Sequence, residues 1–135
     1  MRILAIIGLI CAASLTTLAA GIDGKWIWER QVGDVDGKSY SHTSTFTLKN
    51  EDGKLTGTVV QVSAAPWMKE MTGRVIEIAD GKLDGNKFSF KVQMEIERGV
   101  RTAMYEGTIE GDQLKGTVKY RGIGITEPFL ANRAK

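Results

Sequence analysis

The sequence predicts an all-β protein in which eight strands close into an antiparallel up-and-down β-barrel behind an N-terminal signal peptide. Three observations support this fold class. Apolar and polar residues alternate with a period of two along most of residues 21–135, turn sequences rich in Asp and Gly recur about every thirty residues, and neighbouring strands can be aligned apolar face to apolar face. A closed barrel is the simplest arrangement of such strands because it leaves no unpaired edge.

Residues 1–20 have the composition of a secretory signal peptide. Arg2 is their only charged residue, residues 3–13 form an apolar run, and small residues close the segment at 19–21. This order is typical of a signal peptide and its cleavage site. Cleavage after Ala20 leaves residues 21–135 as a single β-barrel domain, which we expect to be secreted or periplasmic. The alternative is an uncleaved N-terminal anchor.

The composition of residues 21–135 limits the partners that we expect. These residues contain no cysteine, so the core must stabilise the domain without a disulfide. They carry 17 basic and 16 acidic residues, a balance that provides no electrostatic footprint for nucleic acid or for a membrane surface. We therefore expect no nucleic-acid partner and, after signal cleavage, no membrane insertion.

The alternation is clearest in residues 88–96, where apolar side chains occupy the even positions and polar side chains the odd ones. Residues 40–48 and 114–121 follow the same period, which predicts strands with one face on a core and one in water. Only residues 66–71 have a short helical period. Turn signals place the eight strands near 24–30, 40–49, 54–62, 72–79, 87–97, 101–110, 113–121 and 126–134.

Three similar turn sequences, at residues 52–57, 80–85 and 111–116, contain Asp-Gly or Gly-Asp pairs that suit tight hairpins. Because strand direction alternates, these hairpins fall at one end of the barrel, which we name the closed end. The other four connections, near 32–39, 63–71, 97–101 and 121–127, fall at the opposite end. They are mostly longer and dissimilar, as binding loops usually are, so we name this the open end.

The last hairpin fixes a register. A two-residue turn at Gly111-Asp112 gives four facing pairs of apolar residues or glycines on one side, and it sets Glu106 and Glu110 diagonal to lysines on the other. The predicted pairs are Ile109 with Leu114, Gly107 with Gly116, Tyr105 with Val118, and Ala103 with Tyr120.

The inward faces differ between the two ends. Toward the closed end they carry large apolar side chains that we expect to fill the barrel: Trp26, Phe46, Leu48, Leu55, Phe88, Phe90, Ile109 and Leu114. Toward the open end they mix aromatic and polar side chains, the composition of a small-molecule pocket: Trp28, Arg30, Tyr40, His42, Gln61, Arg74, Met94 and Tyr120. Trp67, in the connection after the third strand, is either a lid over a ligand or a plug of the loop.

Gly24-Lys25-Trp26 in the first strand and Arg133 in the last resemble the signature of the calycin superfamily, which contains lipocalins, fatty-acid-binding proteins and avidins. The resemblance is to the superfamily and to no one branch, because the helices, disulfides and late tryptophans that mark the branches are missing. It implies a barrel whose closed end is crossed by Trp26, with Arg133 packed on that ring.

His42 is the only histidine, and two interpretations are open. It is either a ligand-binding group near the opening or a neutral histidine hydrogen-bonded among barrel side chains. Ser44 lies two residues away, but no glycine elbow or oxyanion loop accompanies it. One histidine without cysteine cannot assemble a usual metal site, and 34–37 is better explained as a polar turn than as a calcium loop. We therefore predict no catalytic residue, no metal and no cofactor.

We expect a protein that binds a small hydrophobic or weakly acidic molecule at the open end, with Arg30 and Arg74 favouring the acid. The predicted ligand-binding residues are Trp28, Tyr40, His42, Gln61, Trp67, Arg74, Met94 and Tyr120. The alternative is a protein-interaction module, such as a secreted inhibitor or an envelope protein, with a filled barrel and Trp67, Arg98 and Arg101 as anchors. An enzyme is the least favoured class, since no acid–base pair is visible.

Overall fold

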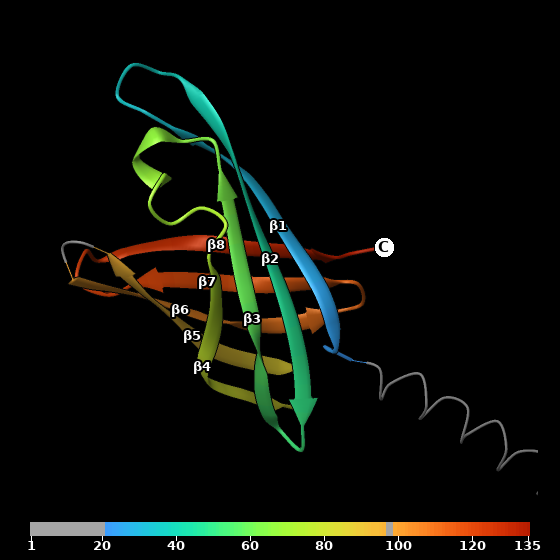
Figure 1. Ribbon diagram of the computed structural model, residues 1–135. Coiled ribbons are helices and arrows are strands. Elements are labelled where there is room, and N and C mark those ends of the chain that lie inside the picture. The colour runs from blue at the N-terminus through green and yellow to red at the C-terminus, as the bar shows by residue number, and fades with distance from the viewer. Residues whose placement is uncertain (1–20, 97–98) are drawn as a thin grey trace, which may run out of the picture.

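A computed structural model describes residues 21–96 and 99–135, and in them eight antiparallel strands form one closed barrel (Figure 1). The strands follow one another in chain order around the barrel, and β1 pairs with β8. The predicted up-and-down fold is therefore confirmed, while the predicted signal peptide at 1–20 lies outside the described residues. The strands are β1 Gly24–Gly33, β2 Ser39–Glu51, β3 Lys54–Ser63, β4 Val75–Asp84, β5 Lys87–Ile96, β6 Gly99–Glu110, β7 Gln113–Tyr120 and β8 Ile125–Arg133.

The barrel is strongly tilted. Figure 1 shows β1, β2 and β3 crossing β5 to β8 at a steep angle, with the β1–β2 hairpin reaching well beyond the rest of the barrel. A short 3-10 helix, η1 (Pro66–Met68), lies in the connection between β3 and β4 near that hairpin. The connections of the open end that the structure describes are thus uneven in length and in reach.

The seam between β1 and β8 is short. The β1–β2 ladder spans Gly24 to Gly33, whereas the β1–β8 ladder joins only Trp26 with Arg133 and Ile27 with Asn132. Both pairs lie at the closed end. Beyond them the two strands flank grooves that include Trp28, Pro128 and Glu127. The backbone therefore closes the barrel at one end only.

The prediction for the fourth strand is wrong in its bounds. We predicted a strand at 72–79 and a hairpin turn starting at Asp80-Gly81, but β4 begins at Val75 and continues to Asp84, and the turn lies at Gly85-Asn86. Asp80 does have a positive φ of 52°, and the β4–β5 register shifts between Ala79 and Lys82. The Asp-Gly pair thus forms a β-bulge instead of a turn, because both features use the left-handed conformation that Asp and Gly tolerate.

The β6–β7 register is confirmed in all four predicted pairs. On the outer face, Lys115 pairs with Glu110 at 3.8 Å and Lys119 with Glu106 at 4.0 Å. At the Gly107–Gly116 pair the two backbones approach so closely that a Cβ on Gly116 would lie 1.9 Å from the carbonyl oxygen of Glu106. Glycine is therefore required at this position of the ladder.

Aromatic side chains fill the closed half of the barrel. Phe46 contacts Phe90, Tyr105 and Phe129 with ring centroids between 5.4 and 5.8 Å apart, mostly in edge-to-face geometry. Every residue that we predicted to fill this half is buried, except Ile109, which is half-buried. The core is therefore solid below Tyr105, and any cavity must lie toward the open end.

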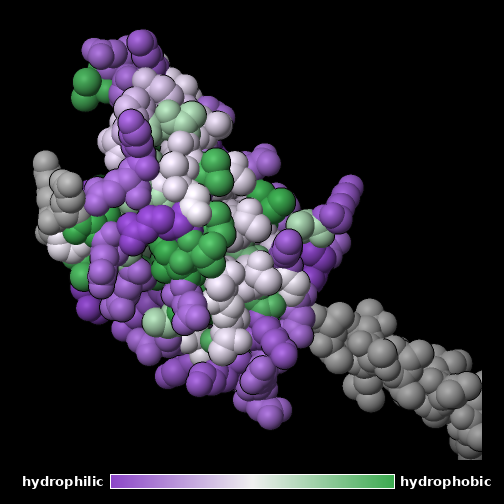
Figure 2. Space-filling view, viewed as in Figure 1, coloured by the Kyte–Doolittle hydropathy of each residue, from purple (hydrophilic) through white to green (hydrophobic). Residues whose placement is uncertain are grey.

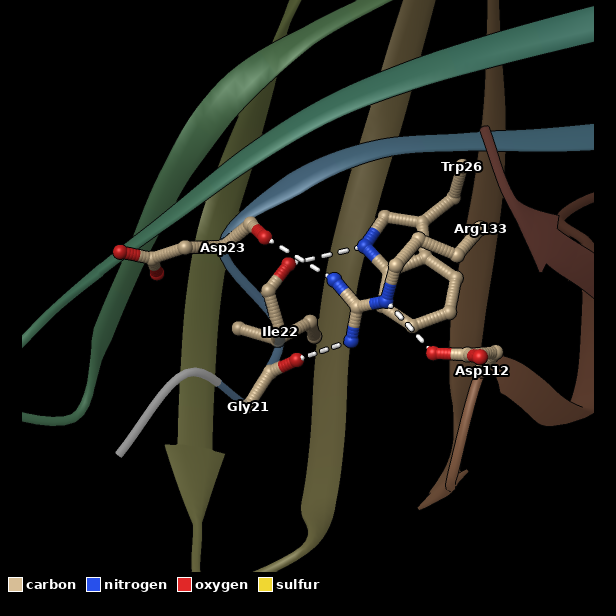
Figure 3. Close-up of polar contacts among 6 residues, drawn as sticks. All are labelled: Gly21, Ile22, Asp23, Trp26, Asp112 and Arg133. Carbon is tan, nitrogen blue, oxygen red and sulfur yellow. Dashed lines mark hydrogen bonds and ion pairs between the residues drawn. The ribbon is translucent and has the colours of Figure 1, made fainter. Parts of the chain in front are cut away.

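Trp26 and Arg133 close the bottom of the barrel (Figure 3). The Arg133 guanidinium lies 4.2 Å from the centre of the Trp26 ring and donates hydrogen bonds to the carbonyls of Gly21 and Asp23, at 2.6 and 3.1 Å. Its Nε donates to the Asp112 carboxylate at 3.0 Å, and Trp26 Nε1 donates to the Ile22 carbonyl at 2.8 Å. The contact implied by the calycin resemblance is therefore present.

Replacing Arg133 with Ala should lower the free energy of unfolding by about 2 kcal/mol, because three hydrogen bonds and the cation–π contact are lost together. Urea unfolding monitored by circular dichroism measures this. Arg121→Ala is the matched control: Arg121 is exposed, and its loss should change stability by less than about 0.5 kcal/mol. Equal effects of the two substitutions would contradict the structural role of Arg133.

Candidate functional site: a cavity at the open end

The open end contains a cavity of about 350 Å³. This volume lies at the lower end of the range of small-molecule sites. Its wall is mainly apolar, with polar side chains that converge from β1, β2, β3, β6, β7 and β8. The lining residues are Arg30, Val32, His42, Gln61, Trp67, Met68, Met71, Val92, Met94, Arg101, Thr102, Ala103, Tyr105, Tyr120, Ile123, Ile125 and Glu127.

Five of the eight predicted ligand-binding residues line this cavity: His42, Gln61, Trp67, Met94 and Tyr120. Trp28 lies below it in the core, where its ring packs edge-on against Phe129 at 5.1 Å. Tyr40 lies outside the lining, with its hydroxyl donating to the Asp34 carboxylate at 3.2 Å. The structure thus gathers most of the predicted set around one space, and binding by these residues stays a prediction.

Arg74 does not line the cavity. We placed it inside because we predicted a strand at 72–79, but β4 begins one residue after Arg74. Its guanidinium instead donates to the backbone carbonyl of Glu95 at 2.8 Å. Arg74 therefore braces the connection before β4 against the end of β5.

His42 is fully enclosed in the wall of the cavity, with 2% of its surface exposed. Neither ring nitrogen has a hydrogen-bond partner among the described residues, and the same holds for the hydroxyl of Ser44, two residues along the same face. Burial lowers the pKa of His42 below its ordinary value, and the positive charge of Arg30 adds to this effect while Glu127 opposes it. The imidazole is therefore neutral at pH 7, with one donor and one acceptor that no described residue satisfies.

A polar network joins β1, β7 and β8 at the cavity wall. Arg30 forms an ion pair with Glu127 and donates to the Tyr120 hydroxyl at 3.3 Å, and that hydroxyl donates to Glu127 at 3.0 Å. Burial raises the pKa of Tyr120, so its hydroxyl keeps the proton that the last bond requires. The network spans the seam where the β1–β8 ladder is missing, so side chains join the two strands in place of the backbone.

Glu127 was missed in the sequence analysis. The signal that could have found it is the period of two in the last strand. Counting back from Arg133, the inward positions are Ala131 and Phe129, whose side chains are buried, and the next inward position is Glu127. Glu127 pairs with Arg30, and Arg74 lies outside the cavity lining, although Arg101 belongs to it. The preference for an acidic ligand that we expected from Arg30 and Arg74 therefore stays a prediction.

The connection between β3 and β4 covers part of the mouth. Trp67 is 51% exposed and packs edge-on against Tyr40, with ring centroids 5.6 Å apart. Met68 and Met71, which the sequence analysis did not select, also line the cavity. The helical period at 66–71 was the signal for these two residues, since it directs 68 and 71 to the same side. Trp67 therefore lies at the rim, between cavity and solvent.

No protein-family model, curated protein or solved structure matches this chain. What the described residues define is an eight-stranded antiparallel barrel, closed at one end by a Trp–Arg contact and hollow at the other, which is compatible with a calycin-like fold. In residues 21–96 and 99–135 there is no group of three or more His, Cys, Asp or Glu side chains that could hold a metal ion. No helix of this part is long and apolar enough to cross a membrane.

The lowered pKa of His42 makes stability depend on pH with a defined sign. As the pH falls through 6.5, the ordinary value, the unfolded chain takes up a proton that the folded chain still excludes, so folding becomes less favourable. The loss from this group stops once the pH is below the folded pKa. When the pH is lowered from about 7.5 to about 5, the midpoint of chemical unfolding should therefore fall more in the native protein than in His42→Phe. Parallel curves for the two proteins would contradict the buried, neutral state of His42.

Glu127→Gln should destabilise the protein by about 1 to 2 kcal/mol, because it leaves the partly buried Arg30 charge without a counterion. Chemical denaturation of the single variant measures the effect. The double variant Arg30→Leu/Glu127→Leu should recover most of the loss, since neither charge then remains unpaired. A double variant as unstable as the single one would show that the network does not act through charge pairing.

Proposed function

We propose that this protein is a calycin-like binding protein that holds a small, partly apolar molecule in the cavity at the open end. The observation that carries the proposal is His42: a buried imidazole in the cavity wall whose two nitrogens have no partner in the described part of the chain. Leaving buried polar atoms without hydrogen bonds costs free energy. A ligand that supplies such a bond would recover that cost and gain apolar burial as well.

The charges in the buried part of the cavity favour an uncharged ligand. Glu127 balances Arg30, and His42 is neutral, so this part of the wall offers hydrogen bonds without a net charge. The remaining charged residue of the lining, Arg101, is exposed to solvent. Apolar contacts come from Met68, Met71 and Met94, whose flexible thioether side chains adapt to varied shapes. We propose an apolar body, such as a small ring system, with one hydroxyl or carbonyl directed at His42.

The place of action that fits this proposal is outside the cytoplasm. The support for it is the signal-like composition of residues 1–20 and the absence of cysteine from residues 21–135, which lets the barrel fold in an oxidising compartment without mispaired disulfides.

The test is a titration with 1-naphthol, a neutral ring with one hydroxyl, and with 1-naphthoate, a ring of the same kind that carries a charge. Isothermal titration calorimetry should show saturable binding of 1-naphthol to the native protein and weaker binding of 1-naphthoate. His42→Phe should reduce the affinity for 1-naphthol by about tenfold or more, since the acceptor is lost. His42→Gln, which keeps a hydrogen-bonding side chain, should retain more of it.

Met104→Ser is the control, because Met104 lies on the outer face of β6 and does not line the cavity. It should bind 1-naphthol like the native protein. Unchanged affinity in His42→Phe would remove His42 from the site. A folded protein that binds neither probe would contradict the proposal and favour the alternative, a protein-interaction module that uses the open-end loops.

A further inference from the structure

The edge of β1 that faces away from β2 has unpaired backbone groups. Ala134 donates its backbone N–H to the Lys25 carbonyl at 2.9 Å, so the odd-numbered residues of β1 direct their N–H and C=O groups toward β8. The ladder with β8 ends at Ile27. The odd-numbered residues beyond it, which have no partner strand in the described part of the chain, are Glu29, Gln31 and Gly33.

The free edge of β8 is protected against another strand, whereas the free edge of β1 is not. On β8, Pro128 has no N–H group and lies in the grooves between the two strands. Beyond Ile27, β1 has no proline and no outward lysine, and its register with β2 continues without a bulge. The inward charge of Arg30 is already paired with Glu127. The edge of β1 is therefore open to an added strand.

Apolar side chains lie at both ends of this free edge. The β1–β2 hairpin extends beyond the rest of the barrel (Figure 1), and Figure 2 shows a hydrophobic side chain among hydrophilic ones at its far end. Val35 lies in the turn of this hairpin and is fully exposed. At the other end of the free edge, a groove between β1 and β8 is lined in part by Ile27, Pro128 and Leu130.

We propose that two copies of this chain form a symmetric dimer, in which their β1 strands pair antiparallel along the free edge about a twofold axis at Gln31. This register pairs all three free residues of each strand, because Gln31 faces Gln31 of the second copy and Glu29 faces Gly33. Each facing pair exchanges two backbone hydrogen bonds. A second copy fits as the occupant because the edge is complementary to itself: no like charges face each other, and a glutamate meets a glycine.

The same register gives the exposed Val35 a contact. Strands paired about Gln31 bring residue 35 of one copy to the level of Ile27 of the other, where the groove with Leu130 lies. The twofold axis repeats this contact at the other end of the ladder. Burial of Val35 and of the exposed Leu130 adds apolar area to the backbone hydrogen bonds. The interface is small, so we expect a dissociation constant in the micromolar range.

The first test uses single cysteines in the full chain, with Cys11→Ser as the background because Cys11 is its only cysteine. Gln31→Cys sets two thiols across the axis, where the Cα atoms of a facing pair lie about 5.5 Å apart, within reach of a disulfide. Glu29→Cys is the matched control: residue 29 is also exposed, but its two copies lie at least about 13 Å apart. Mild oxidation should give a covalent dimer from Gln31→Cys and little from Glu29→Cys.

The second test changes the charge at position 33 and measures dimerisation by sedimentation velocity. Gly33 is exposed, and a Cβ there would lie 3.7 Å from its nearest neighbour, the Lys38 carbonyl oxygen, so a side chain fits. Gly33→Glu sets a carboxylate opposite Glu29 on both sides of the axis and should weaken the dimer by about tenfold, whereas Gly33→Lys should strengthen it. Glu29→Lys/Gly33→Glu makes the facing charges opposite again and should restore dimerisation. Circular dichroism confirms that each variant is folded.

A native protein that stays monomeric at millimolar concentration would overturn the proposal. So would equal cross-linking at positions 29 and 31, or a dimer that Gly33→Glu and Gly33→Lys leave unchanged, because its interface would then lie elsewhere. None of these outcomes depends on a ligand, since Glu29, Gln31 and Gly33 do not line the cavity. Failure of the dimer and failure of the proposed function are therefore distinguishable.

Discussion

The Arg133 guanidinium lies between the Trp26 ring, two backbone carbonyls and the Asp112 carboxylate, and this contact holds the first and last strands together. The β1–β8 ladder contains only two residue pairs, one of which is Trp26 with Arg133. Gly24, with a φ of 128°, lets the chain turn into β1 directly beneath the guanidinium. The aromatic core packs on the inner side of this closure. Since the closed half is filled, the space for a ligand is confined to the open half.

The interiors of the two halves of the barrel differ in the kind of side chain that fills them. In the closed half, aromatic rings pack against one another, and the buried Trp26 Nε1 is satisfied by the Ile22 carbonyl. In the open half, polar side chains enter the interior, and Arg30, Tyr120 and Glu127 balance one another. His42, Ser44 and the Nε of Arg30 keep buried polar atoms without a partner in the described part of the chain. His42 and Ser44 lie between the filled core and the mouth, and this position is the basis of the proposed binding site.

Much of the fold could be predicted from the sequence, because the period of two is a direct consequence of strand geometry. The β6–β7 register and the filled closed half followed from it. The bulge at Asp80 could not be predicted, since an Asp-Gly pair is equally suited to bulges and to turns. Because the predicted bounds of the fourth strand were wrong, Arg74 was wrongly included in the predicted site. Glu127 was missed because a carboxylate on an inward face becomes understandable only once its partner across the seam, Arg30, is known. Met68 and Met71 were missed because the short helical period at 66–71 shows only that they share a side, and not that this side faces the barrel.

The short seam between β1 and β8 also determines how the barrel can move. Every other pair of neighbouring strands shares a longer ladder of residue pairs, whereas beyond Ile27 no backbone pairing joins β1 and β8. Pro128, which has no N–H group, faces the groove there and discourages another strand from adding to the free edge of β8. Along this seam the Arg30–Glu127 ion pair and the hydrogen bonds of Tyr120 hold the wall together in place of a backbone ladder. Because parting the strands here would enlarge the cavity, its resting volume is a lower bound on the size of the largest molecule that the barrel can accommodate.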